Sequence, residues 1–350
     1  MSLLRILDAA NAAELKAWQE IYSTLPAKEV QANPAYVRLF ANQSDRAVCA
    51  LWQDAKGTIL FPFILRALSE EDWAGADNDA TDLITPYGYG GPYAWGEPDN
   101  GAFWCCFEEW ARQNKAVSLF ARLSLFPEQS IPFHGEVEAK SANIVRTLDL
   151  EPDEIWMDYS HKVRKNVKKA QRNGLTVEID EQGSRLEEFL EIYYSTLDRR
   201  NALGGYYFER EFFNAIVTDL PGQSAFFHTL LDGKVISTEL VLISDNHIYS
   251  FLGGTIVSSY DLRPNDLLKH EIILWGHFAG KKAYILGGGY HDQDGIFQYK
   301  KSFAPGGEVM FRVGKKIFDP DRYAQLVEKR GSLLNGSRST VADYFPAYRV

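Results

Sequence analysis

The order of secondary-structure elements predicted for the first half of the chain constrains the fold most, because it recurs in the second half. Residues 47–53 and 58–65 are apolar, strand-like runs, and the turn that begins at Asp54 joins them into a hairpin. Residues 103–114 then predict a helix, and residues 117–123 predict a further strand. The first half therefore predicts hairpin, helix and strand in that order.

The second half predicts the same elements again. Residues 225–231 and 235–243 are strand-like and flank a turn at Asp232. A helix is expected to begin near Pro264, since proline favours the first helical turn, and residues 283–286 predict the next strand.

The spacing between matching positions is similar in the two halves. Trp110 and Trp275, one in each predicted helix, lie 165 positions apart, and the turn residues Asp54 and Asp232 lie 178 apart. Such offsets favour duplication of one α/β unit, although hairpin, helix and strand is an order common enough to recur by chance. The predicted fold is α/β (α+β), with two tandem domains whose mixed sheets are flanked by helices.

The length of the chain also favours two domains. Its 350 residues exceed a typical domain of about 150 residues. We expect an N-terminal domain over residues 1–152 and a C-terminal domain over residues 175–330. A basic connecting helix is expected over residues 153–174, and residues 331–350 form a tail with no assigned structure.

Composition excludes several classes of protein. The net charge of −10 argues against a globally basic nucleic-acid-binding surface. The three cysteines have neither a metal-ligand spacing nor an even disulfide framework, so no metal site is expected. No phosphate loop or nucleophile turn occurs, and no apolar run approaches the ~20 residues of a membrane span. We expect a cytoplasmic protein.

The segment after Ser160 combines an apolar stripe with a dense basic face. Ser160 can cap a helix whose stripe is Val163, Val167 and Ala170. Seven of the twelve residues from 161 to 172 are Lys, Arg or His. This face is either a solvated surface or a site for a phosphorylated or tRNA donor. The candidate donor-binding residues are Lys162, Arg164, Lys165, Lys168 and Lys169.

Aromatic residues supply candidates for substrate binding. The loop over residues 81–93 places three tyrosines among glycines and prolines, where their rings could stack on a sugar or base or form an inter-domain plug. The candidate substrate-binding residues are Tyr87, Tyr89, Tyr93, Arg199, Tyr207 and Phe303.

A glycine-rich stretch, residues 287–303, comes directly after the strand predicted over residues 283–286. Its glycines would let the backbone approach a ligand, although their spacing does not match a dinucleotide-binding turn and the residues after them do not predict a helix. Lys300 is the candidate for stabilising a phosphate or an oxyanion, and His291 or Asp292 is the candidate base. These three are the predicted catalytic residues.

One further acid stands in a predicted strand. Glu239 is either a buried acid or, as we expect more strongly, a solvent-facing residue on an edge strand.

Three segments together resemble the FemABX family, aminoacyl-transferring relatives of the GNAT acyltransferases that are built from two GNAT-like halves. They are residues 87–92, residues 156–170 with a Trp followed by a basic helix, and residues 287–303 with an aromatic-Lys-x-x-Phe ending. The resemblance implies amide formation on an amine acceptor, usually a muropeptide precursor of peptidoglycan, with aminoacyl-tRNA as donor. It also implies a charge-stabilising role for Lys300.

Two departures from the family pattern widen the expected chemistry. Tyr93 follows Gly90-Gly91-Pro92 where many members have an acidic residue, so a nucleotide- or lipid-linked amino sugar is an alternative acceptor. Residues 253–264 lack the pyrophosphate-binding turn of acetyl-CoA-using GNAT enzymes, which favours aminoacyl-tRNA or an unusual acyl donor over acetyl-CoA.

The expected function is an N-acyl or aminoacyl transferase acting on a cell-envelope precursor, with aminoacyl-tRNA or acyl-CoA as co-substrate and no tightly bound cofactor. The alternatives are an acetyl-CoA-dependent N-acetyltransferase of a nucleotide-linked amino sugar and a non-catalytic precursor-binding protein.

Overall fold

The computed structural model describes residues 4–75, 78–201, 204–289, 293–333 and 344–350. The chain packs into two compact units. The first comprises residues 1–140 and 311–350, and the second comprises residues 141–310. The domain boundaries given above stay predictions, and each unit is described by itself.

The first unit is a mixed sheet with helices on both faces. Its strands follow the order β1-β2-β3-β4-β6-β13, with β5 paired to β3. Only β4 and β6 run parallel among these described strands. The strands are β1 (Leu4–Asp8), β2 (Arg46–Gln53), β3 (Gly57–Ala67), β4 (Thr81–Ile84), β5 (Tyr93–Gly96), β6 (Ala116–Arg122) and β13 (Glu308–Ile317). The helices are α1 (Ala12–Ser23), α2 (Pro34–Leu39), α3 (Asn100–Gln113) and α10 (Pro320–Leu333).

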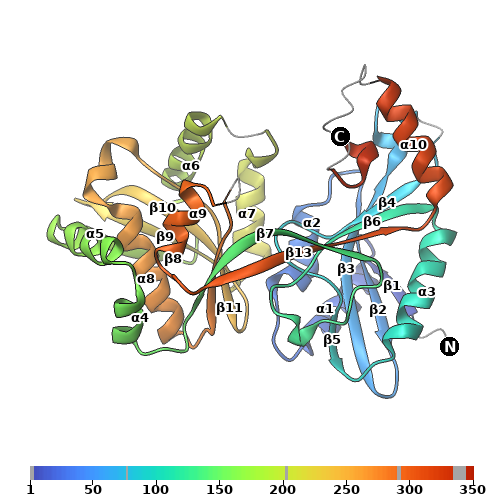
Figure 1. Ribbon diagram of the computed structural model, residues 1–350, viewed down its shortest axis with the longest axis horizontal. Coiled ribbons are helices and arrows are strands. Elements are labelled where there is room, and N and C mark those ends of the chain that lie inside the picture. The colour runs from blue at the N-terminus through green and yellow to red at the C-terminus, as the bar shows by residue number, and fades with distance from the viewer. Residues whose placement is uncertain (1–3, 76–77, 202–203, 290–292, 334–343) are drawn as a thin grey trace. The chain divides into compact units, whose positions relative to one another are not determined.

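The alternation of side chains along β2 and β3 places these helices. Ala50 and Phe61 pack in the cluster under α3, whereas Leu51 and Leu60 pack in the cluster under α1. Because neighbouring residues of a strand point to opposite faces, α1 and α3 cover opposite faces of the sheet (Figure 1).

The second unit repeats this plan. Its strands follow the order β8-β9-β10-β11-β12-β7, and of these described strands only β11 and β12 run parallel. The strands are β7 (Glu136–Thr147), β8 (Thr176–Asp180), β9 (Ser224–Leu231), β10 (Lys234–Ile243), β11 (His247–Thr255) and β12 (Ala283–Gly287). The helices are α4 (Pro152–Asp158), α5 (His161–Arg172), α6 (Leu186–Arg200), α7 (Arg210–Asp219), α8 (Pro264–Phe278) and α9 (Gly295–Lys301). Phe226 contacts α6 and Phe227 contacts α8, so these helices also cover opposite faces.

The two units match residue by residue at their parallel strand pairs. Leu83 pairs with Leu119 in the first unit, and Ile248 pairs with Tyr284 in the second. Ile248 lies 165 positions after Leu83, and Tyr284 lies 165 positions after Leu119. Trp275 lies at the same distance from Trp110. Helices α3 and α8 keep this offset to their ends, where Lys115 and Gly280 both take a left-handed conformation. The predicted α/β fold with mixed sheets flanked by helices is confirmed, and the chain consists of two units of the same topology.

In each unit, the strand that pairs with the second parallel strand is not the next strand along the chain. In the order of the chain, β7 follows β6 but pairs with β12, and β13 follows β12 but pairs with β6. The chain therefore crosses between the units along β7 and again along β13.

The last residues, for which the sequence assigned no structure, pack into the first unit. Tyr348 is fully buried and its hydroxyl lies 2.7 Å from Ser118 Oγ on β6. Arg349 donates from Nε to Asp82 Oδ2 at 2.8 Å, and Arg330 on α10 donates to the carbonyl oxygen of Val350. Residues 344–350 thus fix α10 to the sheet.

Candidate functional site

The second unit contains a buried polar network where β11 and β12 begin to diverge. These strands pair only at His247–Tyr249 and Ala283–Ile285, and β11 then continues to Thr255 alongside β10. Lys269, in the middle of α8, points onto the sheet at this place and is 5% exposed. The network therefore lies under α8, on the face that the helix covers.

Lys269 is the centre of the network. Its Nζ donates to Glu239 Oε2 at 2.5 Å, to Ser250 Oγ at 2.9 Å and to the hydroxyl of Tyr284 at 3.0 Å. The Tyr284 hydroxyl in turn donates to the other carboxylate oxygen of Glu239. All three donor sites of the ammonium group are used, as a buried charge requires. Burial lowers the pKa of Lys269, and the neighbouring Glu239 opposes that shift.

The position of Glu239 corrects the sequence analysis. Its side chain is 4% exposed, and it stands on β10, which lies between β9 and β11. The expectation of a solvent-facing residue on an edge strand was therefore wrong, because the charge is satisfied by Lys269 and Tyr284 instead of by water.

Lys300 lies beside this network, on the short helix α9. That helix begins after Asp294, whose side chain accepts a hydrogen bond from the backbone nitrogen of Phe297 at 2.8 Å. Lys300 Nζ donates to the carbonyl oxygen of Gly288 at 2.7 Å. Burial, followed by the nearby charge of Lys269, lowers the pKa of Lys300 to about 8. The sequence had not predicted this helix after the glycine-rich turn.

The other residues predicted from the glycine-rich stretch have different placements. His291 and Asp292 lie outside the described residues. Phe303 is fully buried, and its ring packs 5.6 Å from Tyr159 and 5.3 Å from Tyr299 between centroids. In this unit Phe303 occupies a core position next to the helix that carries Lys300; its predicted contact with a substrate stays a prediction.

Arg199, on α6, lies near the last residue of β11, with its guanidinium group 3.5 Å from the carbonyl oxygen of Thr255, and Tyr207 contacts α6. The guanidinium group of Arg199 lies 5.4 Å from the ring centroid of Tyr260, and the Tyr207 hydroxyl donates to Asp198 Oδ1 at 2.9 Å. Both side chains are exposed. They are accessible to a ligand, and their predicted binding role stays a prediction.

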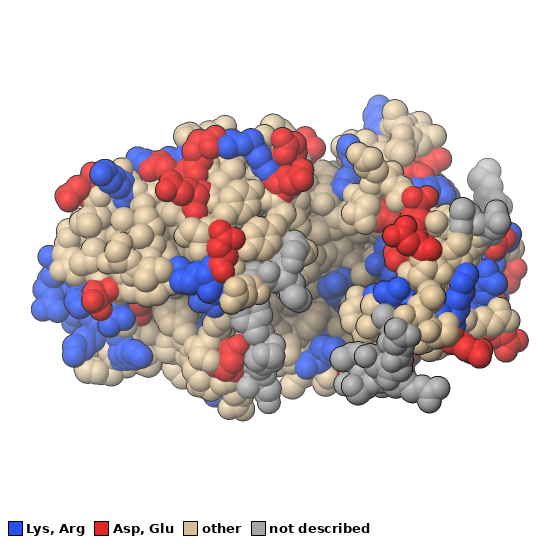
Figure 2. Space-filling model, turned by 90° about the horizontal axis from the view of Figure 1, so that it is seen from above, with Lys and Arg blue, Asp and Glu red and all other residues tan. Residues whose placement is uncertain are grey.

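The predicted basic helix is present as α5, and its stripe is buried against α8. Lys162, Lys165, Lys168 and Lys169 are exposed, and Figure 2 shows Lys and Arg gathered at the end of the molecule where α5 lies. Lys168 Nζ lies 5.6 Å from the ring centroid of Trp156. The cations of α5 and the partly exposed ring of Trp156 on α4 thus lie side by side.

Arg164 differs from these lysines. Its guanidinium group donates to the carbonyl oxygen of Met157 at 2.7 Å and also to that of Tyr159. It therefore satisfies carbonyl groups at the end of α4, which have no partner within the helix. These contacts use the guanidinium group that the sequence analysis assigned to binding of the phosphorylated or tRNA donor.

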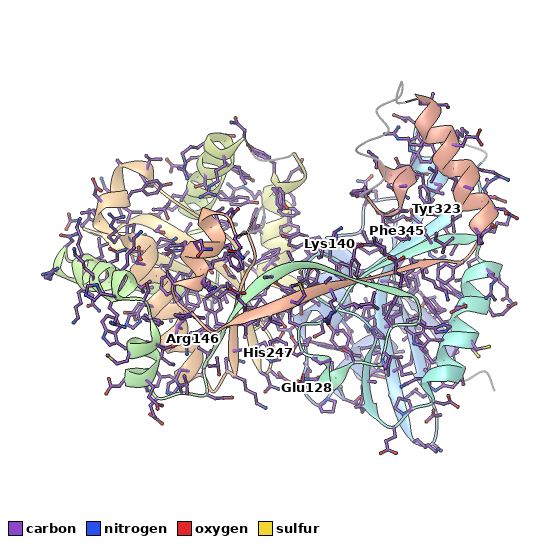
Figure 3. The ribbon with its side chains drawn as sticks, viewed as in Figure 1. Glu128, Lys140, Arg146, His247, Tyr323 and Phe345 are labelled. Carbon is purple, nitrogen blue, oxygen red and sulfur yellow. The ribbon has the colours of Figure 1, made fainter. Side chains whose placement is uncertain are left out.

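Arg146 is a buried cation that the sequence analysis did not single out. It lies on β7 in the second unit (Figure 3) and is 2% exposed. It pairs with Asp158 on α4 and donates to the carbonyl oxygen of Phe303 at 3.2 Å. This residue joins α4 to the segment just after α9, and only the three-dimensional contacts reveal it, because its partners Asp158 and Phe303 lie 12 and 157 positions away in the sequence.

The tyrosines of the loop after β4 belong to the first unit and have three different environments. Tyr87 is 41% exposed, with the Arg122 guanidinium group 5.9 Å from its ring centroid. Tyr89 packs edge-on against Phe311 and is half-buried. Tyr93 is 2% exposed and pairs in β5, so it is a core residue. Of the three, Tyr87 offers the most ring surface to a ligand.

Within the described ranges, no group of three or more His, Cys, Asp or Glu side chains could hold a metal ion. Among the same residues, no helix is long and apolar enough to cross a membrane.

Comparisons with known proteins agree with this geometry. Residues 158–301, which include the buried network and Lys300, match the family model described as an acetyltransferase (GNAT) domain. This match supports an acyltransferase domain within the second unit, and a domain of this kind implies an acyl-CoA co-substrate. No curated protein sequence matches the chain.

Solved structures share the fold over most of the chain. The crystal structure of FemX is 14% identical with a TM-score of 0.64, covering 89% of this chain and 98% of that one. The C-terminal domain of a putative lysylphosphatidylglycerol synthetase from Agrobacterium fabrum is 15% identical with a TM-score of 0.57, covering 93% and 99%. A conserved protein of unknown function from Bacteroides thetaiotaomicron is 11% identical with a TM-score of 0.57, covering 87% and 97%. The predicted resemblance to FemABX-type, GNAT-like acyltransferases is confirmed by this shared fold together with the domain match.

Proposed function

Starting from an acyltransferase domain within a FemX-like fold, we propose that the protein forms an amide on an amine of a cell-envelope precursor. The domain match supports acyl transfer. The cell-envelope acceptor is supported by the FemABX resemblance and by the likeness to a protein named as a lysylphosphatidylglycerol synthetase. The acceptor is a muropeptide or a nucleotide- or lipid-linked amino sugar.

The observation that carries the proposal is the placement of Lys300. It stands where β11 and β12 diverge, and its ammonium group is held by the carbonyl oxygen of Gly288 next to the buried Lys269. A partly buried cation held there can stabilise negative charge that develops on a reacting oxygen.

The reaction balances without any other reagent. The acceptor nitrogen attacks the acyl carbonyl carbon and the new C–N bond forms. The bond from that carbon to the sulfur or oxygen of the carrier then breaks, and the carrier leaves with the proton that the nitrogen gives up. Lys300 stabilises the oxyanion formed between these two steps, and holding both reactants in place supplies much of the acceleration.

The carrier of the acyl group is acyl-CoA in the first candidate, as the domain match implies. A specific observation favours aminoacyl-tRNA as a second candidate. Helix α8 begins with Pro264, which has no backbone N–H, and its first turn contains the buried Asp266. These features weaken an anion site for pyrophosphate at that helix end, whereas the exposed lysines of α5 suit a polyanion.

Mass spectrometry of the acceptor tests the proposal. The purified protein is incubated with acyl-CoA or with charged tRNA and a panel of muropeptide and amino-sugar acceptors. We expect one acceptor to gain the mass of the acyl group with one donor, and to gain it about 10²–10³-fold more slowly with the Lys300→Met variant. If no amine in the panel is modified by either donor, the proposed reaction is wrong.

A further inference from the structure

Among the described strands, each unit has a single pair of parallel neighbours, and a cation lies at the carboxyl end of each pair. With the offset of 165 positions, Arg122 corresponds to Gly287, and these are the last residues of β6 and β12. In the second unit the cation is Lys300, which donates to the carbonyl oxygen of Gly288, the residue after Gly287. In the first unit the cation is Arg122 itself.

The side chain of Arg122 is fixed at the place where β4 and β6 part. Ile84 and Phe120 are the last residues that pair between these strands, which lie side by side in Figure 1. Beyond them, the backbone nitrogen of Arg122 donates to Thr85 Oγ1 at 2.8 Å, and its guanidinium group donates to the carbonyl oxygen of Thr85 at 2.9 Å. In α/β sheets, the carboxyl ends of diverging parallel strands are the common place for a ligand.

Arg122 has no acid partner among the residues that the structure describes. Its guanidinium group has five N–H bonds, and the hydrogen bond to Thr85 uses one of them. Asp82, on β4, does not neutralise it, because its two carboxylate oxygens pair with Arg66 at 2.7 Å and with Arg349 at 2.8 Å. A half-buried charge without an acid partner does not stabilise the fold, and its unused donors are available to a ligand.

The rings around Arg122 hold its guanidinium group in place. The Cζ atom lies 5.3 Å from the ring centroid of Phe120 and 5.9 Å from that of Tyr87. The backbone of Tyr87 is held in turn by the buried Tyr36, whose hydroxyl donates to the carbonyl oxygen of Tyr87 at 2.9 Å. A guanidinium group that is already positioned loses little freedom on binding, and its fork matches two oxygens of a phosphate or carboxylate group.

We propose that the first unit has an oxyanion-binding site of its own, in which Arg122 binds a phosphate or carboxylate group and the exposed ring of Tyr87 contacts the molecule that carries it. This site goes beyond the proposed function, because Lys300 and the residues that match the acetyltransferase model lie in the second unit. It gives the first unit a binding role that does not depend on acyl transfer.

Protection of arginine side chains from phenylglyoxal tests the proposal without any variant. The full-length protein is modified at increasing anion concentrations, and peptides are quantified by mass spectrometry. Inorganic pyrophosphate represents a phosphate ligand, and N-acetylglycine represents a carboxylate ligand. We expect one of them to slow the modification of Arg122 several-fold and to leave that of the exposed Arg5 unchanged. If Arg122 is not modified at all, or if neither anion protects it, the proposal is wrong.

A variant without the guanidinium group measures its contribution to affinity. Isothermal titration calorimetry with the protecting anion should give roughly 10–100-fold weaker binding for Arg122→Gln, as expected for the loss of hydrogen bonds between charged groups. Arg5→Gln has the same net charge and should bind like the native protein. Native affinity in Arg122→Gln would overturn the proposal, and the protection experiment decides alone if this variant does not fold. Neither measurement involves acyl transfer, so this site and the proposed reaction can fail separately.

Discussion

Lys300 Nζ lies 2.7 Å from the carbonyl oxygen of Gly288, twelve residues earlier in the chain. The hydrogen bond joins the glycine-rich turn after β12 to the helix α9, the two parts of the stretch that most resembles FemABX proteins. It fixes the position of an ammonium group beside a buried charge network.

Replacing Lys300 with Met should lower the rate of acyl transfer by about 10²–10³-fold, the range for loss of one oxyanion-stabilising donor. Since its pKa is lowered to about 8, Lys300 carries its proton below that pH and loses it above. Activity that needs the ammonium group should therefore fall as pH rises through 8. The Lys300→Arg variant keeps its charge at high pH, so any activity it retains should show no such fall, as measured from kcat/KM between pH 6 and 10.

The fold was largely predictable because it depends on local patterns. The sequence shows two hairpins and two Trp-bearing helices at similar offsets. The structure reproduces the offset of 165 between the Trp residues, since Ile248 and Leu83 hold matching places in the parallel strand pairs. The buried network was not predictable. Lys269 on an amphipathic helix reads as a surface residue, and Glu239 in a strand gives no sign of its partner until both elements are packed.

The sequence also could not predict whether a basic residue is free to bind a ligand or is used to satisfy backbone carbonyl groups. Arg164 reads as one more cation of a basic helix, and only the backbone path from α4 to α5 shows that it satisfies the carbonyl groups of Met157 and Tyr159. Within the described part of the chain, the exposed lysines of the same helix donate to no backbone carbonyl group, so the predicted donor surface and the structural arginine can be separated experimentally.

Replacing Lys165, Lys168 and Lys169 with Ala should weaken the binding of charged tRNA if tRNA is the donor. Removing three phosphate contacts should lower the salt dependence of log K by roughly 2–3. A triple variant of exposed lysines elsewhere, Lys16, Lys56 and Lys234, carries the same net charge and is the control. Binding is measured by filter retention at several salt concentrations. Equal losses in both triple variants would show that only net charge matters.

Replacing Arg164 with Ala should instead destabilise the second unit. Two carbonyl groups at the end of α4 lose their donor, at a cost of about 1–3 kcal/mol where water cannot replace it. Urea unfolding followed by circular dichroism measures this change, with Lys165→Ala on the same helix as the control. If Arg164→Ala unfolds at the same urea concentration as the control, the guanidinium group is not needed to end α4.

Gly254 on β11 should not tolerate a side chain. A Cβ atom there would lie 2.4 Å from Thr196 Oγ1 and 2.8 Å from the carbonyl oxygen of Ile192 on α6. The Gly254→Ala variant is expected to lose about 1–3 kcal/mol of stability from overpacking. Gly331→Ala on α10, where no atom lies within 4 Å of the added Cβ, should gain about 0.5–1 kcal/mol from helix propensity. Thermal unfolding of both variants checks the opposite signs.

Residues 344–350 should contribute strongly to the stability of the first unit, and Tyr348 offers the sharpest test. Its ring is fully buried against α10, where Tyr323 packs 5.3 Å away, and Tyr323 also stacks on Phe345 (Figure 3). Tyr348→Ala should cost about 3–5 kcal/mol, as deletion of a buried aromatic ring does.

The hydroxyl group of Tyr348 should account for a smaller, separable part. Tyr348→Phe leaves Ser118 Oγ buried without its partner and should cost about 1–3 kcal/mol. Adding Ser118→Ala removes that unpaired group, so the double variant should be no less stable than Tyr348→Phe alone. Chemical denaturation of the single and double variants measures the coupling. Strictly additive losses would mean that the two hydroxyl groups do not bond, so that residues 344–350 are held by ring packing, the Arg349 ion pairs and the hydrogen bond from Arg330 to Val350.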